Sequence, residues 1–321
     1  MSPSLELWKN SHVRENRTWE FSLSDDQRNE LVHVTRAAIA DGATLDSITI
    51  DQFPLPGLTD VIDKINNDLS QGLGFVLLQK FPVDLLSSDE TELAYYGLGL
   101  HLGTPVRQNS NYELLSHIRD DRIEQNGQIK RLYRTRERQD FHTDAADIIG
   151  LLCLHKAKSG GESKIVSSPT VYAEMMSRRP DLVDELRVPL IWDKQDEHKE
   201  GETPWFALPP IFDLNGEARI FYVGWYIRNA QRWPEVPRLT AKQLEAMELL
   251  ESIANNPAFY LEMDFEPGDI QFLNNGRILH AREEYDDWED PDKRRHLLRL
   301  WLAAHKFVSL EEKLRTGVNA Q

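Results

Sequence analysis

The chain has 321 residues, of which 40% are hydrophobic and 28% are charged, and its formal net charge is -16 at pH 7. This composition is typical of a globular protein that is long enough to bury a hydrophobic core. The negative charge argues against nucleic acids and anionic membrane surfaces as partners, because both are polyanions. We therefore expect neither as a partner, and the sequence leaves open whether the chain forms a homo-oligomer.

A single cysteine, Cys153, excludes a disulfide framework and a cysteine-rich zinc site. It lies in an apolar segment, which favours a buried thiol over a catalytic nucleophile. The N-terminal segment is too polar for a signal peptide, and no apolar run approaches the ~18 residues of a membrane span. We therefore expect a cytoplasmic protein. We also expect one domain over residues 1–321, because no repeat or flexible linker divides the sequence.

The first third of the chain is predicted to be mainly helical. Ser24 and Gln27 have the spacing of a capping box at the start of an amphipathic helix that ends at Gly42. Apolar residues recur on one face of a second helix over residues 58–69. The next predicted elements are a buried strand at 74–79, a helix at 88–97, and strands at 112–119 and 129–138.

Residues 140–168 contain a pattern that is typical of a metal site. His142-Thr143-Asp144 precedes an apolar strand at 148–154, a turn at 159–161 and a second short strand at 164–166. In an extended chain residues i and i+2 point to the same side, so His142 and Asp144 can reach one divalent ion. A similar triplet at 198–200 lies in a polar run that we expect to be a solvated loop.

Helices, a hairpin and strands are predicted in the remaining part of the chain. Asn215-Gly216 is a strong hairpin turn, and Thr240 with Gln243 has the spacing of a capping box. The predicted elements are helices within 169–187, a charged loop at 193–204, a hairpin of 205–214 with 218–227, a helix at 240–254, and strands at 259–265, 270–273 and 296–303.

His280 is the third candidate metal ligand, because it lies on a predicted strand after residues 277–279. Two histidines and one carboxylate on adjacent strands form a facial triad, which leaves three open positions on one side of an octahedral ion. A structural zinc site would fill four positions and would usually include cysteine.

Two arginines follow His280 on the last predicted strand. Arg295 and Arg299 alternate with Leu297 and Trp301, so both guanidinium groups lie on one face. Arginine can hold a carboxylate through two parallel hydrogen bonds, although a pair of surface or salt-bridged arginines would give the same pattern. The basic run at 130–138, directly before His142, is either a solvated face or the rim of an anion site.

Taken together, these motifs resemble the taurine/2,4-D dioxygenase (TauD/TfdA-like) family of Fe(II)- and 2-oxoglutarate-dependent dioxygenases. The resemblance extends from about residue 74 to residue 306. The motifs that carry it, in chain order, are His142-Thr143-Asp144, Gly160-Gly161-Glu162-Ser163, Pro267-Gly268-Asp269, Asn274-Asn275 with His280-Ala281-Arg282, and Arg294, Arg295 and Arg299.

The resemblance implies a mainly β fold with peripheral helices (α+β), namely a double-stranded β-helix or jelly roll of the cupin-like, clavaminate synthase-like type. Its core would cover about 74–306, with an N-terminal helical part at about 20–72. His142, Asp144 and His280 would hold Fe(II), and O₂ would be a cosubstrate. Ser163 and a late arginine, Arg295 in our choice, would bind the distal carboxylate of 2-oxoglutarate. Arg299 would then meet an anionic group of the substrate, or the two arginines would exchange roles.

The resemblance further implies oxidation, by default hydroxylation, of a small anionic or amino-acid-like substrate with release of succinate and CO₂. Retention of Asp144 disfavours halogenation. A zinc-dependent hydrolase on the same triad and a non-enzymatic metal-binding jelly roll remain as alternatives. The candidate substrate residues are Gln108, Asn109, Tyr112, Phe206, Asn274 and Asn275. Tyr222, Trp225 and Tyr226 are further candidates for the substrate pocket, although a hairpin core is favoured for most of the aromatic residues.

Overall fold

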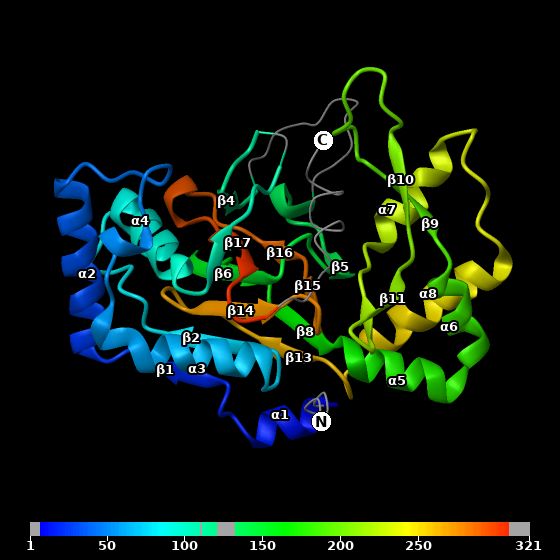
Figure 1. The fold of residues 1–321 in the computed structure, drawn as a ribbon, viewed down its shortest axis with the longest axis horizontal. Coiled ribbons are helices and arrows are strands. Elements are labelled where there is room, and N and C mark those ends of the chain that lie inside the picture. Colours follow the sequence, from blue (N-terminus) through cyan, green and yellow to red (C-terminus); the bar gives the residue numbers. More distant parts are fainter. Residues whose placement is uncertain (1–6, 110, 121–131, 308–321) are drawn as a thin grey trace.

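The computed structural model describes residues 7–109, 111–120 and 132–307. Two β-sheets lie at its centre (Figure 1). The larger sheet contains β1 (Glu20–Ser22), β2 (Phe75–Gln79), β3 (Gly103–Pro105), β4 (Leu115–Ile118), β6 (Ile148–His155), β14 (Ile270–Asn274) and β17 (His296–Ala304). The smaller sheet contains β5 (Gln139–His142), β8 (Ser163–Ser167), β13 (Leu261–Met263) and β15 (Ile278–Arg282).

The strand orders bring distant parts of the chain together. The larger sheet has the order β1-β2-β14-β6-β17-β3, with β4 also paired to β17, and the smaller sheet has the order β13-β8-β15-β5. All pairs are antiparallel except β1 with β2. Three further two-stranded ribbons are formed by β7 (Ser159–Gly160) with β16 (Tyr285–Asp286), β9 (Leu190–Asp193) with β10 (Trp205–Leu208), and β11 (Ile211–Leu214) with β12 (Glu217–Ile220).

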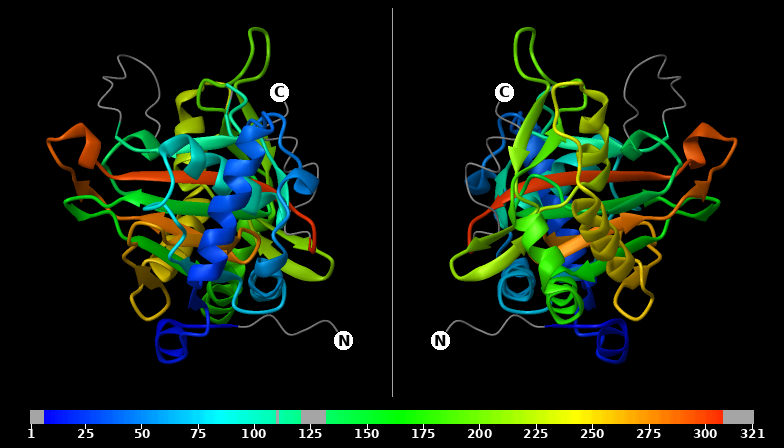
Figure 2. Two further views of the ribbon diagram at one scale, coloured as in Figure 1. Left: turned by 90° about the vertical axis from the view of Figure 1, so that its left-hand side faces the viewer. Right: turned by 90° about the vertical axis from the view of Figure 1, so that its right-hand side faces the viewer.

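Helices cover the outer sides of the two sheets. In Figure 1, α2, α3 and α4 lie on the left, and α5, α6, α7 and α8 lie on the right. Figure 2 views the molecule from these two sides, with α2 in front of the strands in one view and α5 and α8 in front in the other. The helices are α1 (Asn10–Glu15), α2 (Asp25–Ala40), α3 (Thr59–Ser70), α4 (Ser88–Leu100), α5 (Ser168–Arg178), α6 (Pro180–Arg187), α7 (Gly224–Asn229) and α8 (Ala241–Ala254).

Strand alternation divides the hydrophobic core into two clusters. On β17, Leu297 and Trp301 belong to the cluster that also contains residues of the smaller sheet and of α5, α6 and α8. The intervening Leu298 and Leu300 belong to the cluster that contains residues of α2, α3 and α4. Because successive strand residues point to opposite faces, the larger sheet separates these two clusters. Two mainly antiparallel sheets with a shared interior and outer helices confirm the predicted jelly roll.

The local helix signals in the sequence are confirmed. Ser24 and Gln27 form the predicted capping box at the start of α2, and Thr240 and Gln243 form one at the start of α8. The second predicted helix corresponds to α3, and the predicted strand at 74–79 corresponds to β2. None of the described helices is long and apolar enough to cross a membrane.

The predicted long hairpin is correct only near its turn. Strands β11 and β12 pair around Asn215-Gly216, as expected. However, β10 pairs with β9 instead of continuing into β11, because Pro209 and Pro210 lack the N–H groups that would extend the ladder. Strand β12 ends at Ile220 and α7 begins at Gly224, so the strand prediction for 224–227 is wrong. Packing overrides the β preference of Trp225 and Tyr226 there.

The strand predicted over 129–138 is also wrong where it can be compared. Residues 132–134 form a short 3₁₀ helix, and residues 129–131 lie outside the described part of the chain. The Thr135 hydroxyl donates to the Leu132 carbonyl and accepts the Glu137 N–H. Such local side-chain bonds favour a turn over a strand.

Candidate active site

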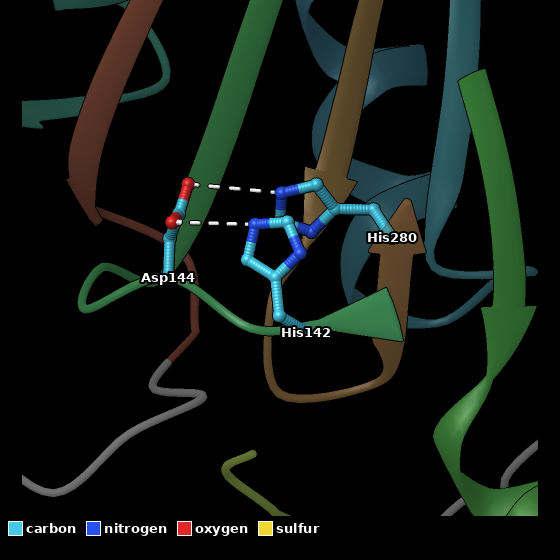
Figure 3. A group of neighbouring side chains, drawn as sticks. All are labelled: His142, Asp144 and His280. Atoms are coloured by element: carbon cyan, nitrogen blue, oxygen red, sulfur yellow. Dashed lines mark ion pairs between the residues drawn. The ribbon is translucent and has the colours of Figure 1, made fainter. Parts of the chain in front are cut away.

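His142, Asp144 and His280 come together at the edge between the two sheets. His142 ends β5 and is the register partner of His280 on β15, so the two imidazole rings lie with their centroids 4.2 Å apart. Asp144 follows two residues after His142 and turns toward both rings (Figure 3). Its Oδ1 lies 3.9 Å from His142 Nε2, and its Oδ2 lies 3.7 Å from His280 Nε2.

This geometry fits one divalent ion. The three donor atoms lie within 4.8 Å of one another, whereas neighbouring ligands on an ion at about 2.1 Å lie about 3 Å apart. A small inward shift of the side chains would therefore bring all three donors onto one face of an ion. The remaining positions on the opposite face would be open to other ligands.

The protonation states suit metal binding. Burial lowers the pKa of His142, and burial together with His142 lowers the pKa of His280 to about 3. Burial alone would raise the pKa of Asp144, but Arg299 and the two histidines outweigh it and hold the pKa below its usual value. At neutral pH the imidazoles are neutral and the carboxylate is ionised, which is the state that binds a cation.

Hydrogen bonds fix the orientation of Asp144. The indole Nε1 of Trp301 donates to Oδ2 of Asp144 at 3.0 Å. The side-chain oxygen of Asn275 accepts the Asp144 N–H at 2.9 Å, and its side-chain nitrogen donates to the carbonyls of Asp144 and Ala146. The loop that carries the carboxylate is therefore held to the turn that precedes β15.

The orientation of His142 is fixed in the same way. Its Nδ1 lies 2.8 Å from the Asp140 carbonyl oxygen, so this nitrogen carries the proton and Nε2 presents a lone pair. The side-chain nitrogen of Gln139 lies 3.1 Å from this Nε2 atom. The ring of Trp225 packs edge-on against the imidazole, with the two ring centroids 5.1 Å apart.

An inner cavity lies between the two sheets beside His280. Ser163 on β8, a predicted 2-oxoglutarate ligand, lines this cavity, and its hydroxyl donates to Gln271 Oε1 at 3.1 Å. Arg295, the other predicted ligand, lines the same cavity and is 5% exposed. Arg282 is a third polar lining residue, and it is the register partner of Ser163.

The glycine turn before β8 makes room for Arg295. Gly161 has φ of +80°, and a Cβ atom placed on it would lie 3.0 Å from Arg295 Nε. A side chain at this position would therefore strain the backbone and press against the guanidinium group. Arg295 also donates from one terminal nitrogen to the Gly161 carbonyl at 3.4 Å.

Arg299 lies next to the triad and lines both the inner and the outer cavity. Its Nε donates to Gln108 Oε1 at 2.8 Å, and one terminal nitrogen lies 3.5 Å from Asp144 Oδ2. The guanidinium carbon lies 5.3 Å from the ring centroid of Tyr133 and 4.6 Å from that of Trp301. Gln108 in turn donates to the Arg299 carbonyl at 2.8 Å, so it fixes both ends of this residue.

An outer cavity of about 380 Å³ lies on the other side of the triad, where His142 and Asp144 line it. This volume is within the usual range for a small-molecule site. Among the aromatic pocket candidates, for most of which we favoured a hairpin core, Trp225 and Tyr226 also line it. Among the predicted substrate residues, the cavity is lined by Gln108, Asn109, Tyr112 and Phe206.

Two observations bear on the site prediction. Asn274 and Asn275 do not line the outer cavity, because Asn274 donates to the Leu69 carbonyl and Asn275 holds the Asp144 backbone. The segment at 194–199 is a loop with exposed residues, as expected, and it also lines the outer cavity. Strand β9 is held in place by its pairing with β10, and the segment at 194–199 directly follows β9 in the chain.

Several polar site residues are not apparent from the sequence patterns. Trp301 shares the predicted inward face with Arg299, so its direction could be inferred, but its bond to Asp144 depends on pairing between distant strands. Gln139 and Tyr133 lie between the two cavities, and neither belongs to a recognisable motif.

Comparison with known proteins gives the family. The sequence profile of the taurine catabolism dioxygenase TauD, TfdA family matches residues 40–301. FR-33289 synthase of Streptomyces rubellomurinus is 30% identical over 308 residues, which cover 92% of this chain and 88% of that protein. The taurine hydroxylase-like protein SAT17 of Stachybotrys chartarum is 31% identical over 265 residues, which cover 78% and 66% of the two chains.

Solved structures agree on the fold. Asparagine oxygenase, in complex with Fe(II), 3-hydroxyasparagine and succinate, superposes with a TM-score of 0.69 at 15% identity, covering 89% of this chain and 93% of that chain. The non-haem iron oxygenase OrfP, in complex with Fe and alpha-ketoglutaric acid, superposes with a TM-score of 0.65 at 15% identity, covering 88% and 94%. The chain therefore belongs to the TauD/TfdA family and is a non-haem iron dioxygenase that uses Fe(II), 2-oxoglutarate and O₂.

Proposed function

We propose that this dioxygenase oxidises, by hydroxylation in the default case, a small anionic or amino-acid-like substrate, with conversion of 2-oxoglutarate to succinate and CO₂. The observation that carries the proposal is the position of the triad between two cavities of different character. The inner cavity contains Ser163 and Arg295, which suit a carboxylate, and the outer cavity is large enough for a substrate. Tyr133, Gln139, His142 and Arg299 line both cavities, so two ligands would meet at the triad.

His142, Asp144 and His280 would hold the iron, and the inner cavity would hold 2-oxoglutarate. In this arrangement Ser163 and Arg295 bind the distal carboxylate at the inner end. A terminal nitrogen of Arg299 lies 3.5 Å from Oδ2 of Asp144, so Arg299 would meet the carboxylate of 2-oxoglutarate at the metal end. When bound, iron and 2-oxoglutarate supply the oxidising power by activating O₂. The protein side chains orient these ligands and exclude water from them.

The outer cavity supports a charged, amino-acid-like substrate. The segment at 194–199 brings groups of both signs to its wall, including Lys194, Asp196, Glu197 and Lys199. Groups of both signs suit a zwitterion, which carries an amine and an acid. Asparagine oxygenase and OrfP, whose structures contain hydroxyasparagine and hydroxyarginine, have the same fold and support this substrate class.

A zinc-dependent hydrolase would use the same triad, but it would have no role for Ser163 and Arg295 in the inner cavity. A non-enzymatic metal-binding jelly roll would retain its metal tightly and would not turn over 2-oxoglutarate. Membership of a dioxygenase family disfavours both alternatives.

The test is succinate release from Fe(II)-loaded enzyme with a panel of amino acids, sulfonates and other small acids, with and without O₂. We expect one class to raise succinate formation above the substrate-free rate, together with a product 16 Da heavier than the substrate by mass spectrometry, since one oxygen atom is added (about 16 Da). The Asp144→Ala variant is the matched control and should be inactive. Turnover without O₂, or with zinc in place of iron, would contradict the proposal.

A further inference from the structure

We propose that Arg282 is a further binding residue for 2-oxoglutarate, and that it forms with Arg295 a pair of guanidinium groups around the distal carboxylate. This inference rests on the proposed cosubstrate site in the inner cavity. It assigns a role to the arginine of the His280-Ala281-Arg282 motif, to which the proposed function so far gives none.

The position of Arg282 follows from strand geometry. It lies on β15 two residues after the metal-binding His280, so both side chains point to the same face. Its register partner on β8 is Ser163. Directly opposed residues of an antiparallel pair have Cβ atoms about 4.5–5.5 Å apart, so the guanidinium group and the hydroxyl group are neighbours. Arg282, Ser163 and Arg295 all line the inner cavity.

Both arginines are buried, and neither has a direct ion pair with a carboxylate among the described residues. Arg282 is 7% exposed and Arg295 is 5% exposed. Within residues 7–109, 111–120 and 132–307, neither guanidinium group forms an ion pair, and Nε and NH1 of Arg282 and NH1 of Arg295 have no hydrogen-bond partner. The nearby Asp287 uses its Oδ1 to accept the backbone N–H of Arg295 at 2.8 Å.

The two guanidinium groups share one neighbour and repel each other. Their central carbons lie 5.2 Å and 5.1 Å from the ring centroid of Tyr285. Burial and the charge of Arg295 lower the pKa of Arg282 to about 10, although Tyr285, Asp120 and Glu137 oppose this change. Two buried cations without a direct ion pair are costly unless an anion enters the cavity. A carboxylate between them would satisfy the unpartnered N–H groups and remove the repulsion.

Arg282 is held in place independently of any ligand. One of its terminal nitrogens, NH2, donates to the carbonyl oxygens of Leu132, at 3.2 Å, and Glu137. These two residues bound the segment 133–136, in which Tyr133 lines the inner cavity. The side chain is therefore anchored at one nitrogen, while the other two remain for an anion. Such a pre-ordered donor binds an anion without a further loss of side-chain entropy.

The test measures how tightly two ligands bind to the unmodified protein and to the Arg282→Gln variant. 2-Oxoglutarate and 2-oxopentanoate share the keto-acid end, but 2-oxopentanoate has a methyl group in place of the distal carboxylate. Dissociation constants are measured by anaerobic calorimetry on protein loaded with Fe(II). We expect Arg282→Gln to weaken 2-oxoglutarate binding by about tenfold or more, as for a lost charged hydrogen bond, and to leave 2-oxopentanoate binding unchanged.

Arg219→Gln is the matched control. Arg219 is also buried, at 9% exposed, and two of its nitrogens are without a hydrogen-bond partner among the described residues, but it lies on β12 and lines neither cavity. Its substitution should change neither dissociation constant. Arg282→Lys retains the charge and loses the planar fork, so it should give an intermediate loss for 2-oxoglutarate if Arg282→Gln does not fold.

Three outcomes would overturn the inference. Unchanged 2-oxoglutarate binding in Arg282→Gln would remove any role in binding. Equal weakening of both ligands would show that Arg282 acts only by holding the segment around Tyr133. Failure of the unmodified protein to bind 2-oxoglutarate would overturn the proposed function itself, and this result is distinguishable because it requires no variant.

Discussion

At the scale of single residues, Asp144 connects the metal site to the rest of the molecule. Its carboxylate lies between two imidazoles and receives the indole N–H of Trp301, while Asn275 holds its backbone. These contacts come from β5, β15, β17 and the turn between β14 and β15. The carboxylate therefore has a defined direction before a metal binds, which is what a metal site of high affinity requires.

Replacing Trp301 with phenylalanine should weaken metal binding. The change removes the hydrogen bond to Asp144 Oδ2 and retains an aromatic ring beside Arg299. We expect the affinity for Fe(II) to fall about tenfold to a hundredfold, as measured by anaerobic competition with a chelator of known affinity. Trp288, which is 41% exposed, provides the control Trp288→Phe. Equal affinities for Trp301→Phe and the unmodified protein would show that the indole does not orient the carboxylate.

The candidate metal ligands could be chosen from the sequence because their spacing is local or belongs to a family motif. His142 and Asp144 are two residues apart in an extended segment, and His280 lies in a recognisable context. The roles of Asn275 and Gln108 could not be predicted in this way. Their side chains bind backbone groups of Asp144 and Arg299, which are 131 and 191 residues away in the chain.

At the scale of elements, the turn between β7 and β8 determines the shape of the inner cavity. Gly160 and Gly161 both have positive φ, and the turn places Ser163 at the start of β8. Arg295 occupies the space that a side chain at position 161 would need. The glycines of the family motif are explained by packing, because they allow Arg295 to approach the backbone closely.

The Gly161→Ala variant tests this role. The added methyl group would displace Arg295, so we expect weaker 2-oxoglutarate binding with unchanged metal affinity. Gly216→Ala is a closely matched control, because Gly216 has φ of +83° and no atom within 4 Å of the added Cβ. Both variants should lose about 1–2 kcal/mol in the free energy of unfolding from the left-handed backbone conformation. Equal 2-oxoglutarate dissociation constants in the two variants would contradict the role of Gly161.

Helix starts were predictable at this scale, but the course of the chain from β9 to α7 was not. A capping box depends on residues three positions apart, as at Ser24 and Thr240, so the sequence contains the whole signal. Pro209 and Pro210 indicate a break after β10, but the pairing of β10 with β9 and the formation of α7 depend on contacts outside each segment. For the same reason the segment at 194–199 resembles a solvated loop in the sequence, although it lines the outer cavity.

At the scale of the whole molecule, the jelly roll brings the ends of distant strands to one place. The triad, the inner cavity and the outer cavity receive residues from β5, β8, β15 and β17, which lie in two different sheets. Sequence periodicity predicted the inward face of β17, and the family resemblance implied which residues would meet at the metal. Strand periodicity alone does not give the register that places Arg282 opposite Ser163.

The most direct test of the account is visible absorption of the protein mixed anaerobically with Fe(II) and 2-oxoglutarate. We predict a weak metal-to-ligand charge-transfer band that requires both additions, because the keto acid must chelate an iron held by the triad. The band should weaken in Asp144→Ala, through loss of the metal, and in Arg295→Ala, through loss of the distal carboxylate contact. Absence of the band from the unmodified protein, or its persistence at full strength in both variants, would contradict the assignment of these residues.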